Sequence, residues 1–444
     1  MRRYLATAAV LFAVCAAFAA IVRGQGDLAW ATAWTGSAQG PYPIGNASAQ
    51  PDLSLVFPSA DAGARDQSFR LIVRPDIWGA ETRIRLSNVF GTRPVTFDGV
   101  FVGVQSSGSA VLKETNRAVT FGRQSAVTIP AGGSAWSDLV SLPFVRSDTA
   151  AMLEGRKMAV SFHVAGESGP MTWHAKALTT SYLTPPGGGS KGMEEREDAF
   201  PAATTSWYFL DAVDMRVPRT TRVVVAFGDS ITDGTASTLN GDDRWPDVLS
   251  RRLHMAQGRD VAVVNAGIGG NRVTGPPEYT PQKPFSGGPS AAQRLDRDVL
   301  SLSNVSAVIW LEGINDLNSN AGATVEAVRT AMRDIVSRMR AKKVRVFGAT
   351  LTSALGSTGG SGSAETDQKR RAVNDFIRTS GIFDGVFDFD AATVDLSSGA
   401  LRAEFVPNST VGGAGDRLHP NRLGYAAMAQ SVDLRALLAG PANR

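Results

Sequence analysis

Ser230 follows a run of five apolar residues, Val223–Phe227, within the sequence Gly228-Asp229-Ser230. An apolar run bounded by turn residues predicts a strand that is buried on both faces. We therefore expect Ser230 just past the carboxyl end of a parallel strand, where open α/β sheets place their chemistry. A serine in a turn is often only a turn former or a helix cap, so this position alone leaves that alternative open beside a nucleophile.

A base for such a nucleophile occurs near the end of the sequence. Asp416 and His419 lie three positions apart, directly before Asn421–Ala429, which has helical apolar spacing. On one turn the carboxylate can orient the imidazole and stabilise its protonated form. None of the other three histidines has a carboxylate at this spacing beside a predicted helix start. We expect these three on a strand face (His163), on a helix surface (His254), and in a structural or cleft position (His174).

Two further blocks lie between the serine and the histidine. Val261–Asn271 predicts a strand that runs into a glycine-rich turn, and Val308–Asp316 predicts a strand that ends in a small polar cluster. A glycine turn can direct a backbone N–H into a cleft, and an asparagine can add a side-chain N–H. With the N–H of Ser230 they would form three donors for an oxyanion. Each block alone is also typical of an ordinary turn or cap, and the glycines lack the G-x-G-x-x-G spacing of a dinucleotide loop.

Together the four blocks resemble those of the SGNH hydrolase superfamily, also called the GDSL esterase/lipase family. They occur in the family's order: Gly228-Asp229-Ser230, the glycine turn from Asn265 to Gly270, Gly313-Ile314-Asn315-Asp316, and Asp416-Arg417-Leu418-His419. The first block continues with Ile231 where the family name has leucine, which is a conservative departure. The resemblance covers roughly residues 221–438, about half of the chain, and four ordered blocks make it specific.

The resemblance implies a serine esterase of flavodoxin-like topology that needs no metal and no cofactor. Position by position, it implies a catalytic triad of Ser230, Asp416 and His419. The oxyanion donors that it implies are the amide of Ser230, Gly270 and Asn315. Gly270 is preferred over Gly267 or Gly269 because the sixth residue from Asn265 matches the family block best.

The fold class expected for this half is α/β, with a parallel five-stranded sheet. Apolar strand patterns alternate with amphipathic helix patterns, and such alternation favours a parallel sheet with helices on both faces. The expected strands are 223–227, 261–265, 307–311, 344–350 and 385–389, and the expected helices are 244–256, 290–302, 324–341, 367–379 and 420–438.

The first half has a different pattern of short strands with alternating polarity, separated by Gly, Ser, Asn and Pro. This pattern predicts an all-β, sandwich-like accessory domain over residues 27–215, before a hydrolase domain over residues 221–440. Residues 184–198, rich in glycine and then in charge, are expected to form a flexible segment. The accessory domain has two candidate roles, glycan binding and structural support of the active-site rim.

The N-terminus has the charge, the apolar stretch and the small residues of a secretory leader, which we expect over residues 1–24. An uncleaved membrane anchor is the alternative for this stretch. The single cysteine, Cys15, lies within it, so the remaining chain has no disulfide and no thiol nucleophile. We expect a secreted or periplasmic protein with no stable membrane span after cleavage.

The formal net charge is only +4, and Lys and Arg are spread along the chain. No basic run with interleaved aromatic residues points to nucleic acid, so we expect none as a partner. The expected partner is a small ester or an acylated glycan. The expected function is hydrolysis of short-chain carboxylic esters, above all O-acetyl groups on glycans, through an acyl-serine intermediate. The alternatives are a lipase or lysophospholipase that acts on longer acyl chains, and a non-catalytic glycan-binding protein.

Overall fold

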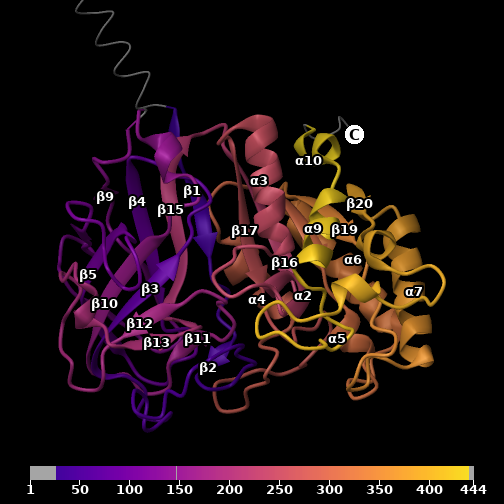
Figure 1. Ribbon diagram of the computed structural model, residues 1–444, viewed down its shortest axis with the longest axis horizontal. Helices are drawn as coiled ribbons and strands as arrows, with labels where there is room; N and C mark the ends of the chain where they lie inside the picture. Colours follow the sequence, from indigo (N-terminus) through magenta and orange to yellow (C-terminus); the bar gives the residue numbers. More distant parts are fainter. Residues whose placement is uncertain (1–26, 147, 440–444) are drawn as a thin grey trace, which may run out of the picture.

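The computed structural model describes residues 27–146 and 148–439 of the chain. An all-β region comes first and an α/β region follows, and the two pack side by side (Figure 1). The expected leader, with Cys15, lies outside the described residues. Among those described, no helix combines the length and the apolarity that a membrane span requires.

The β region is built from two main antiparallel sheets and a small third one. The sheets have the strand orders β1-β15-β4-β8 with β9 on β4, β13-β12-β3-β10-β5-β6 with β7 on β5, and β14-β11-β2. The elements are β1 (Leu28–Thr35), β2 (Gly40–Pro41), β3 (Arg65–Val73), β4 (Glu81–Ser87), β5 (Val95–Val104), β6 (Arg117–Ala118), β7 (Val127–Ile129), β8 (Ser134–Trp136), β9 (Val140–Ser141), η1 (Ala150–Leu153), β10 (Met158–Glu167), β11 (Thr172–His174), β12 (Ser181–Leu183), η2 (Glu197–Ala199), β13 (Ala202–Thr204), β14 (Trp207–Tyr208) and β15 (Leu210–Pro218).

Aromatic side chains fill the centre of this region. Phe69 and Phe162, paired across β3 and β10, stack with their ring centroids 5.2 Å apart. Phe97 of β5 meets Phe162 edge-on, and the ring of Phe209, directly before β15, lies 5.2 Å from that of Phe97. Offset and edge-to-face contacts of this kind are favoured by the ring quadrupoles. The expected antiparallel all-β region is confirmed.

Residues 184–198 do not form the flexible segment that their composition suggested. Their backbone runs beside β3, where Gly187 N donates to Arg65 O at 3.0 Å and Gly189 N donates to Asp66 O at 3.1 Å. The buried guanidinium of Arg70 then donates to the carbonyl oxygens of Ser109 and Glu194. These long-range partners satisfy the backbone, and local composition cannot reveal them.

The α/β region has a parallel sheet of order β17-β16-β18-β19-β20. Numbered along the chain, this is the 2-1-3-4-5 order of flavodoxin-like folds, so the expected topology is confirmed. Its elements are β16 (Arg222–Gly228), α2 (Ser230–Asp233), α3 (Trp245–Gln257), β17 (Val261–Gly267), α4 (Ala291–Leu295), a π-helical turn η3 (Asp296–Leu300), β18 (Val305–Leu311), α5 (Ile314–Leu317), α6 (Val325–Ala341), β19 (Arg345–Ala349), α7 (Ala364–Thr379), β20 (Gly385–Phe387), α8 (Phe389–Thr393), η4 (Ala403–Phe405), α9 (Arg422–Gln430) and α10 (Leu434–Leu438).

Most expected elements of this region differ from the observed ones by one to three residues at an end, and three of them differ for a reason that the structure shows. The helix expected over 290–302 leaves the α-helical path at Asp296, where the π-helical turn begins. The helix expected over 420–438 is two helices, because the carboxylate of Asp433 accepts the amides of Arg435 and Ala436 and starts a new one. The strand expected over 385–389 ends at Phe387, since Asp388 caps α8.

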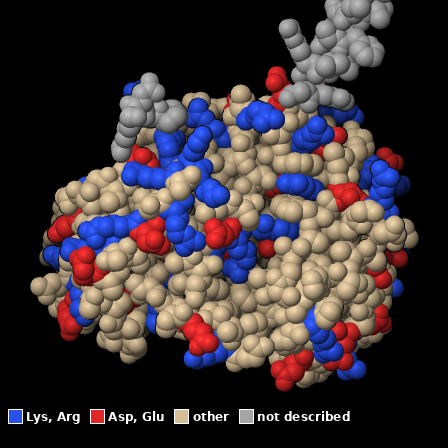
Figure 2. Space-filling model, turned by 180° about the vertical axis from the view of Figure 1, so that it is seen from behind, with Lys and Arg blue, Asp and Glu red and all other residues tan. Residues whose placement is uncertain are grey.

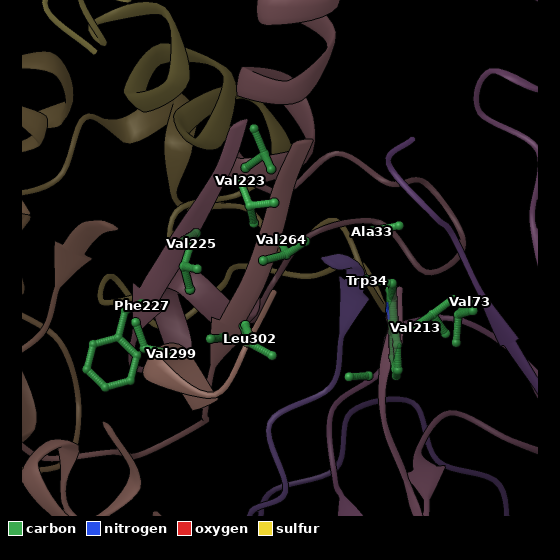
Figure 3. Packing of buried hydrophobic residues seen from close by; sticks show 14 of the residues in the cluster. Ala33, Trp34, Val73, Val213, Val223, Val225, Phe227, Val264, Val299 and Leu302 are labelled. Carbon is green, nitrogen blue, oxygen red and sulfur yellow. The ribbon is translucent and has the colours of Figure 1, made fainter. Parts of the chain in front are cut away.

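One continuous hydrophobic core joins the two regions. Figure 3 shows Val223, Val225 and Phe227 along β16, with Trp34 and Val213 of the β region across the joint. The chain passes between the regions at residues 219–221, so the expected boundary at 215–221 coincides with a change of architecture. Whether 27–215 and 221–440 are separate domains stays a prediction, because their apolar side chains share this core.

A buried carboxylate of the β region accepts a backbone amide at the edge of the parallel sheet. Asp76 Oδ2 accepts the amide of Val263, on edge strand β17, at 2.6 Å, and Oδ1 accepts the hydroxyl of Ser250 on α3. His254 also faces Asp76, with 3.5 Å between Nε2 and Oδ2, and its side chain is only 6% exposed. The expectation of a surface position for His254 is therefore wrong, because the β region covers this part of α3.

The charged surface is mixed in sign. On the face shown in Figure 2, basic side chains gather mainly toward one end of the molecule, with acidic side chains among them. This agrees with the small formal charge of +4.

Replacing Asp76 by Ala should lower the free energy of unfolding by about 1–3 kcal/mol, because a buried edge amide and a hydroxyl lose their acceptor. Urea unfolding followed by circular dichroism measures this. The control Asp61→Ala alters an exposed carboxylate and should change stability by less than about 0.5 kcal/mol. Equal losses in the two variants would contradict a role for Asp76 at the joint.

Candidate active site

Ser230 lies at the carboxyl end of β16, as the first residue of the short helix α2. The Asp229 side chain caps this helix by accepting the amide of Ile231 at 3.0 Å. Gly228 is required before it, since an added Cβ would lie 2.2 Å from the carbonyl oxygen of Leu311. As the first helical residue, Ser230 has an amide without an acceptor inside the helix, which leaves it available to a ligand.

The other end of the chain brings an imidazole to this hydroxyl. His419 Nε2 lies 2.8 Å from Ser230 Oγ, and His419 Nδ1 lies 2.5 Å from Asp416 Oδ2. The second carboxylate oxygen, Asp416 Oδ1, accepts the amides of Leu418 and His419 at 2.9 Å each. The structure thus brings together the three residues of the expected triad, in the order carboxylate, imidazole, hydroxyl.

The Asp416 carboxylate is held in its ionised form. Burial raises its pKa, but the hydrogen bonds from the ring of His419 and from two amides, with the charge of His419, more than offset this effect. The pKa of Asp416 therefore lies well below its ordinary value. An ionised partner at Nδ1 keeps the proton on that nitrogen, and Nε2 is then free to accept one.

The glycine turn after β17 is pressed against α2. An added Cβ at Gly267 would lie 2.2 Å from the amide nitrogen of Asp233, so the turn can approach this closely only with glycine there. Gly270 has a φ of 80°, and its amide donates to no acceptor within residues 27–146 and 148–439. Both features suit a donor that is directed at a ligand.

Asn315 comes from the third strand end, as the second residue of α5 after β18. Its Nδ2 donates to the carbonyl oxygen of Asn271 at 2.9 Å, so this side chain is tied to the residue that follows Gly270. The next residue, Asp316, accepts the amides of Val273 and Thr274 and the Thr274 hydroxyl. The three predicted donors therefore follow three neighbouring strands, and a hydrogen bond links Asn315 to the turn that contains Gly270.

Sequence reasoning missed Arg294 of α4, which is 1% exposed. Its guanidinium donates to the carbonyl oxygens of Gly228 and Ala266 and to the Asn271 side chain, each at 2.7 Å. It lies over the Phe227 ring, 4.1 Å from the centroid. Arginine within an amphipathic helix pattern usually indicates a solvated side chain, so no local signal marks this one.

His174 of β11 also reaches the site. The sequence left it as structural or at a cleft, and the structure places its Nε2 3.1 Å from Asp233 Oδ1, at the end of α2. His163, as expected, lies on a strand, between the carboxylates of Asp98 and Asp66. Within the described part of the chain, no three His, Cys, Asp or Glu side chains are arranged to hold a metal ion.

Two buried acids, Asp229 and Glu312, directly follow β16 and β18. Burial, with charge repulsion from Glu312 and Asp316, raises the pKa of Asp229 well above its ordinary value. Burial likewise raises the pKa of Glu312 to about 7, although Trp310 Nε1 donates to Glu312 Oε2 at 2.9 Å. The second oxygens of Asp229 and Glu312 have no hydrogen-bond partner among the described residues.

This arrangement can carry out nucleophilic acyl transfer. A hydroxyl, a base that contacts it and a carboxylate that orients the base form the activated-nucleophile geometry. Amide donors on the same side can stabilise the negative charge that develops on a carbonyl oxygen. The site also lies at the carboxyl ends of β16 and β18, on either side of the point where the strand order reverses and ligands of open α/β sheets bind.

Residues 226–427 match the GDSL-like Lipase/Acylhydrolase family, and the α/β region of the chain belongs to this family within the SGNH hydrolase superfamily. No protein with a curated description matches the chain in sequence.

Solved structures of similar fold cover this part of the chain. The lipase/acylhydrolase from Enterococcus faecalis is 22% identical, with a TM-score of 0.36, over 47% of this chain and 92% of its own. A carbohydrate acetylesterase family member from Sinorhizobium meliloti is 15% identical, with a TM-score of 0.37, over 49% and 99%. The aryl esterase of M. smegmatis is 17% identical, with a TM-score of 0.37, over 49% and 100%.

The raised pKa of Glu312 predicts how stability varies with pH. The ordinary value is 4.5 and the folded value about 7, so the unfolded chain releases this proton first as the pH rises. The contribution of protonated Glu312 to the free energy of unfolding is complete below pH 4.5. It is lost as the pH rises through 7, which lowers that free energy by up to about 3 kcal/mol. Glu312→Gln has no proton to release, so its stability should fall less between pH 5 and pH 8.

Urea unfolding of both proteins at the two pH values measures this difference. Glu404→Gln, at an exposed glutamate, is the matched control and should keep the wild-type pH dependence. If Glu312→Gln also kept it, Glu312 would not be the group that titrates.

Proposed function

We propose that the protein is an exported serine esterase that hydrolyses short-chain carboxylic esters, with O-acetyl groups on glycans as its substrate class. The observation that carries this proposal is the hydrogen-bonded chain from Asp416 through His419 to the Ser230 hydroxyl. Export follows from the expected leader over residues 1–24.

In this mechanism Ser230 Oγ attacks the ester carbonyl carbon while His419 Nε2 takes the hydroxyl proton. Asp416 orients the ring and stabilises the resulting imidazolium. The amides of Ser230 and Gly270, with Asn315 Nδ2, donate to the oxyanion of the tetrahedral intermediate. His419 then gives its proton to the departing alcohol oxygen and an acyl-Ser230 ester remains. Water attacks that ester with His419 again as base, which releases the acid and restores the hydroxyl.

The composition of two loops beside the site favours a substrate with a small acyl group. Residues 274–289 pack on the oxyanion turn, because an added Cβ at Gly287 would lie 2.2 Å from the carbonyl oxygen of Gly270. Residues 352–365 lie beside Arg417, with an added Cβ at Gly356 3.5 Å from its guanidinium. Leu355 is the one large aliphatic residue in the two segments. A long acyl chain needs an extended apolar groove, which segments of this composition do not supply.

Replacing Ser230 by Ala should lower ester hydrolysis by a factor of ~10⁴ or more while folding is kept, as in other triads. The rate of nitrophenyl acetate hydrolysis measures this loss. An organophosphonate should label Ser230 in the wild type and leave the variant unmodified, as read by mass spectrometry of the labelled peptide.

The matched control is Ser237→Ala, which removes a nearby buried hydroxyl that has no hydrogen-bond partner among the described residues. It should retain wild-type activity and labelling. Near wild-type turnover in folded Ser230→Ala would overturn the proposed nucleophile.

Specificity across acetyl, butyryl, octanoyl and palmitoyl esters should be greatest for the short acyl groups. The comparison uses kcat/KM for one alcohol, because it reports transition-state binding of each acyl chain. Acetate release from acetylated polysaccharides then tests the glycan part of the proposal. A maximum at octanoyl or longer would favour the lipase alternative instead. An inactive wild type that binds glycans would favour the non-catalytic one.

A further inference from the structure

The two peptides on either side of Gly269 are each held by a side chain. The carbonyl oxygen of Gly269 accepts Gln39 Nε2 at 3.1 Å, and the amide of Gly269 donates to Asp233 Oδ2 at 2.9 Å. Gln39 lies 230 residues earlier in the chain, between β1 and β2 of the β region. The carbonyl of Gly269 shares its peptide with the N–H of Gly270, which is the proposed oxyanion donor.

Gln39 is itself firmly placed. Its side chain is fully buried. Its backbone N–H donates to the carbonyl oxygen of Trp173 at 2.8 Å, and its backbone carbonyl oxygen accepts the Tyr279 hydroxyl at 3.1 Å. Its Nε2 donates to Ser286 O as well as to Gly269 O. Because both partners of Nε2 are carbonyl oxygens, only the amide nitrogen of the side chain can face them.

A second contact from the β region steadies Asp233. His174 Nε2 lies 3.1 Å from Asp233 Oδ1, and His174 Nδ1 lies 2.8 Å from the carbonyl oxygen of Ser37. One oxygen of the buried Asp233 carboxylate therefore meets the β region, while the other accepts the amide of Gly269. His174 thus acts on the glycine turn through Asp233.

We propose that Gln39, and His174 through Asp233, are positioning residues of the oxyanion site. A peptide group is planar and its N–H points opposite to its C=O, so fixing Gly269 O also fixes the direction of Gly270 N–H. A hydrogen bond to that oxygen polarises the peptide and strengthens its N–H as a donor. Donors contribute most when they are oriented before charge develops. The inference rests on the proposed esterase function and gives the β region a part in the reaction.

The test is Gln39→Met, which keeps the approximate length of the side chain and removes its donor. Its kcat per active site should fall on the order of 10-fold to 100-fold, less than the ~10²–10³ for direct loss of an oxyanion donor, with KM changed much less. Active sites are counted from the end point of organophosphonate labelling, so a partly unfolded sample does not affect the result.

Gln67→Met is the matched control. Gln67 is also buried in the β region, and its Nε2 also donates to two carbonyl oxygens, those of Val56 and Thr184, away from the active site. It should lose stability without losing kcat per active site. Unchanged kcat in Gln39→Met, or equal losses in both variants, would overturn the inference.

A pair of variants at His174 decides the matter if Gln39→Met does not fold. In His174→Asn the amide can replace Nδ1 and keep the contact with Ser37, but it cannot reach Asp233. In His174→Gln the longer side chain can replace Nε2 and keep that contact. The Asn variant should lose more kcat per active site than the Gln variant, and equal losses would overturn the inference.

Measurements on the wild type distinguish failure of the proposed function from failure of this inference. A wild type that hydrolyses no ester and takes up no phosphonate overturns the proposed function and this inference with it. An active wild type with an unaffected Gln39→Met overturns the inference alone.

Discussion

The buried guanidinium of Arg294 ties together the ends of two strands and the turn that follows one of them. It binds the last carbonyl of β16, the carbonyl of Ala266 near the end of β17 and the side chain of Asn271. A buried charge is costly unless it is paired, and Asp298 supplies its partner with 3.1 Å between the two groups. Ser230 follows the first of these strands and Gly270 the second, so this cation holds together the strand end before the proposed nucleophile and the turn with the proposed oxyanion donor.

The carboxyl groups near Ser230 differ in the direction of their pKa shifts. Directly after β16 and β18, burial raises the pKa values of Asp229 and Glu312, which favours their neutral forms. In the segment before α9, by contrast, hydrogen bonds hold the Asp416 carboxylate ionised beside His419. The pKa values of carboxyl groups in one region are thus shifted in opposite directions, and the difference comes from burial and from the donors around each group. The carboxylate with the lowered pKa is the one that contacts His419.

Much of the α/β region could be predicted from the sequence because its signals are local. The run Val223–Phe227 before Ser230 and the three-residue spacing of Asp416 and His419 each lie within one segment, and the structure brings these segments together. Gln39 and Arg294 carried no such signal, because their partners lie on other elements and a buried glutamine or arginine resembles a surface residue in sequence. The same limit explains the wrong surface prediction for His254 and the wrong flexibility prediction for residues 184–198, which are held by distant partners such as Arg65 and Asp66.

The pairing of β1 with β15 places the start of the described chain and Ser230 at opposite ends of the parallel sheet. Leu28 lies opposite Pro218, a few residues before β16 begins, so the described chain starts at the amino end of the parallel sheet. The guanidinium of Arg222, at that same end, contacts the carbonyl of Leu438. Ser230 lies at the other end of β16, a strand of seven residues and roughly 23 Å in length. A molecule tethered to a surface by the residues before Leu28 would therefore present the sheet edge that carries Ser230 away from that surface.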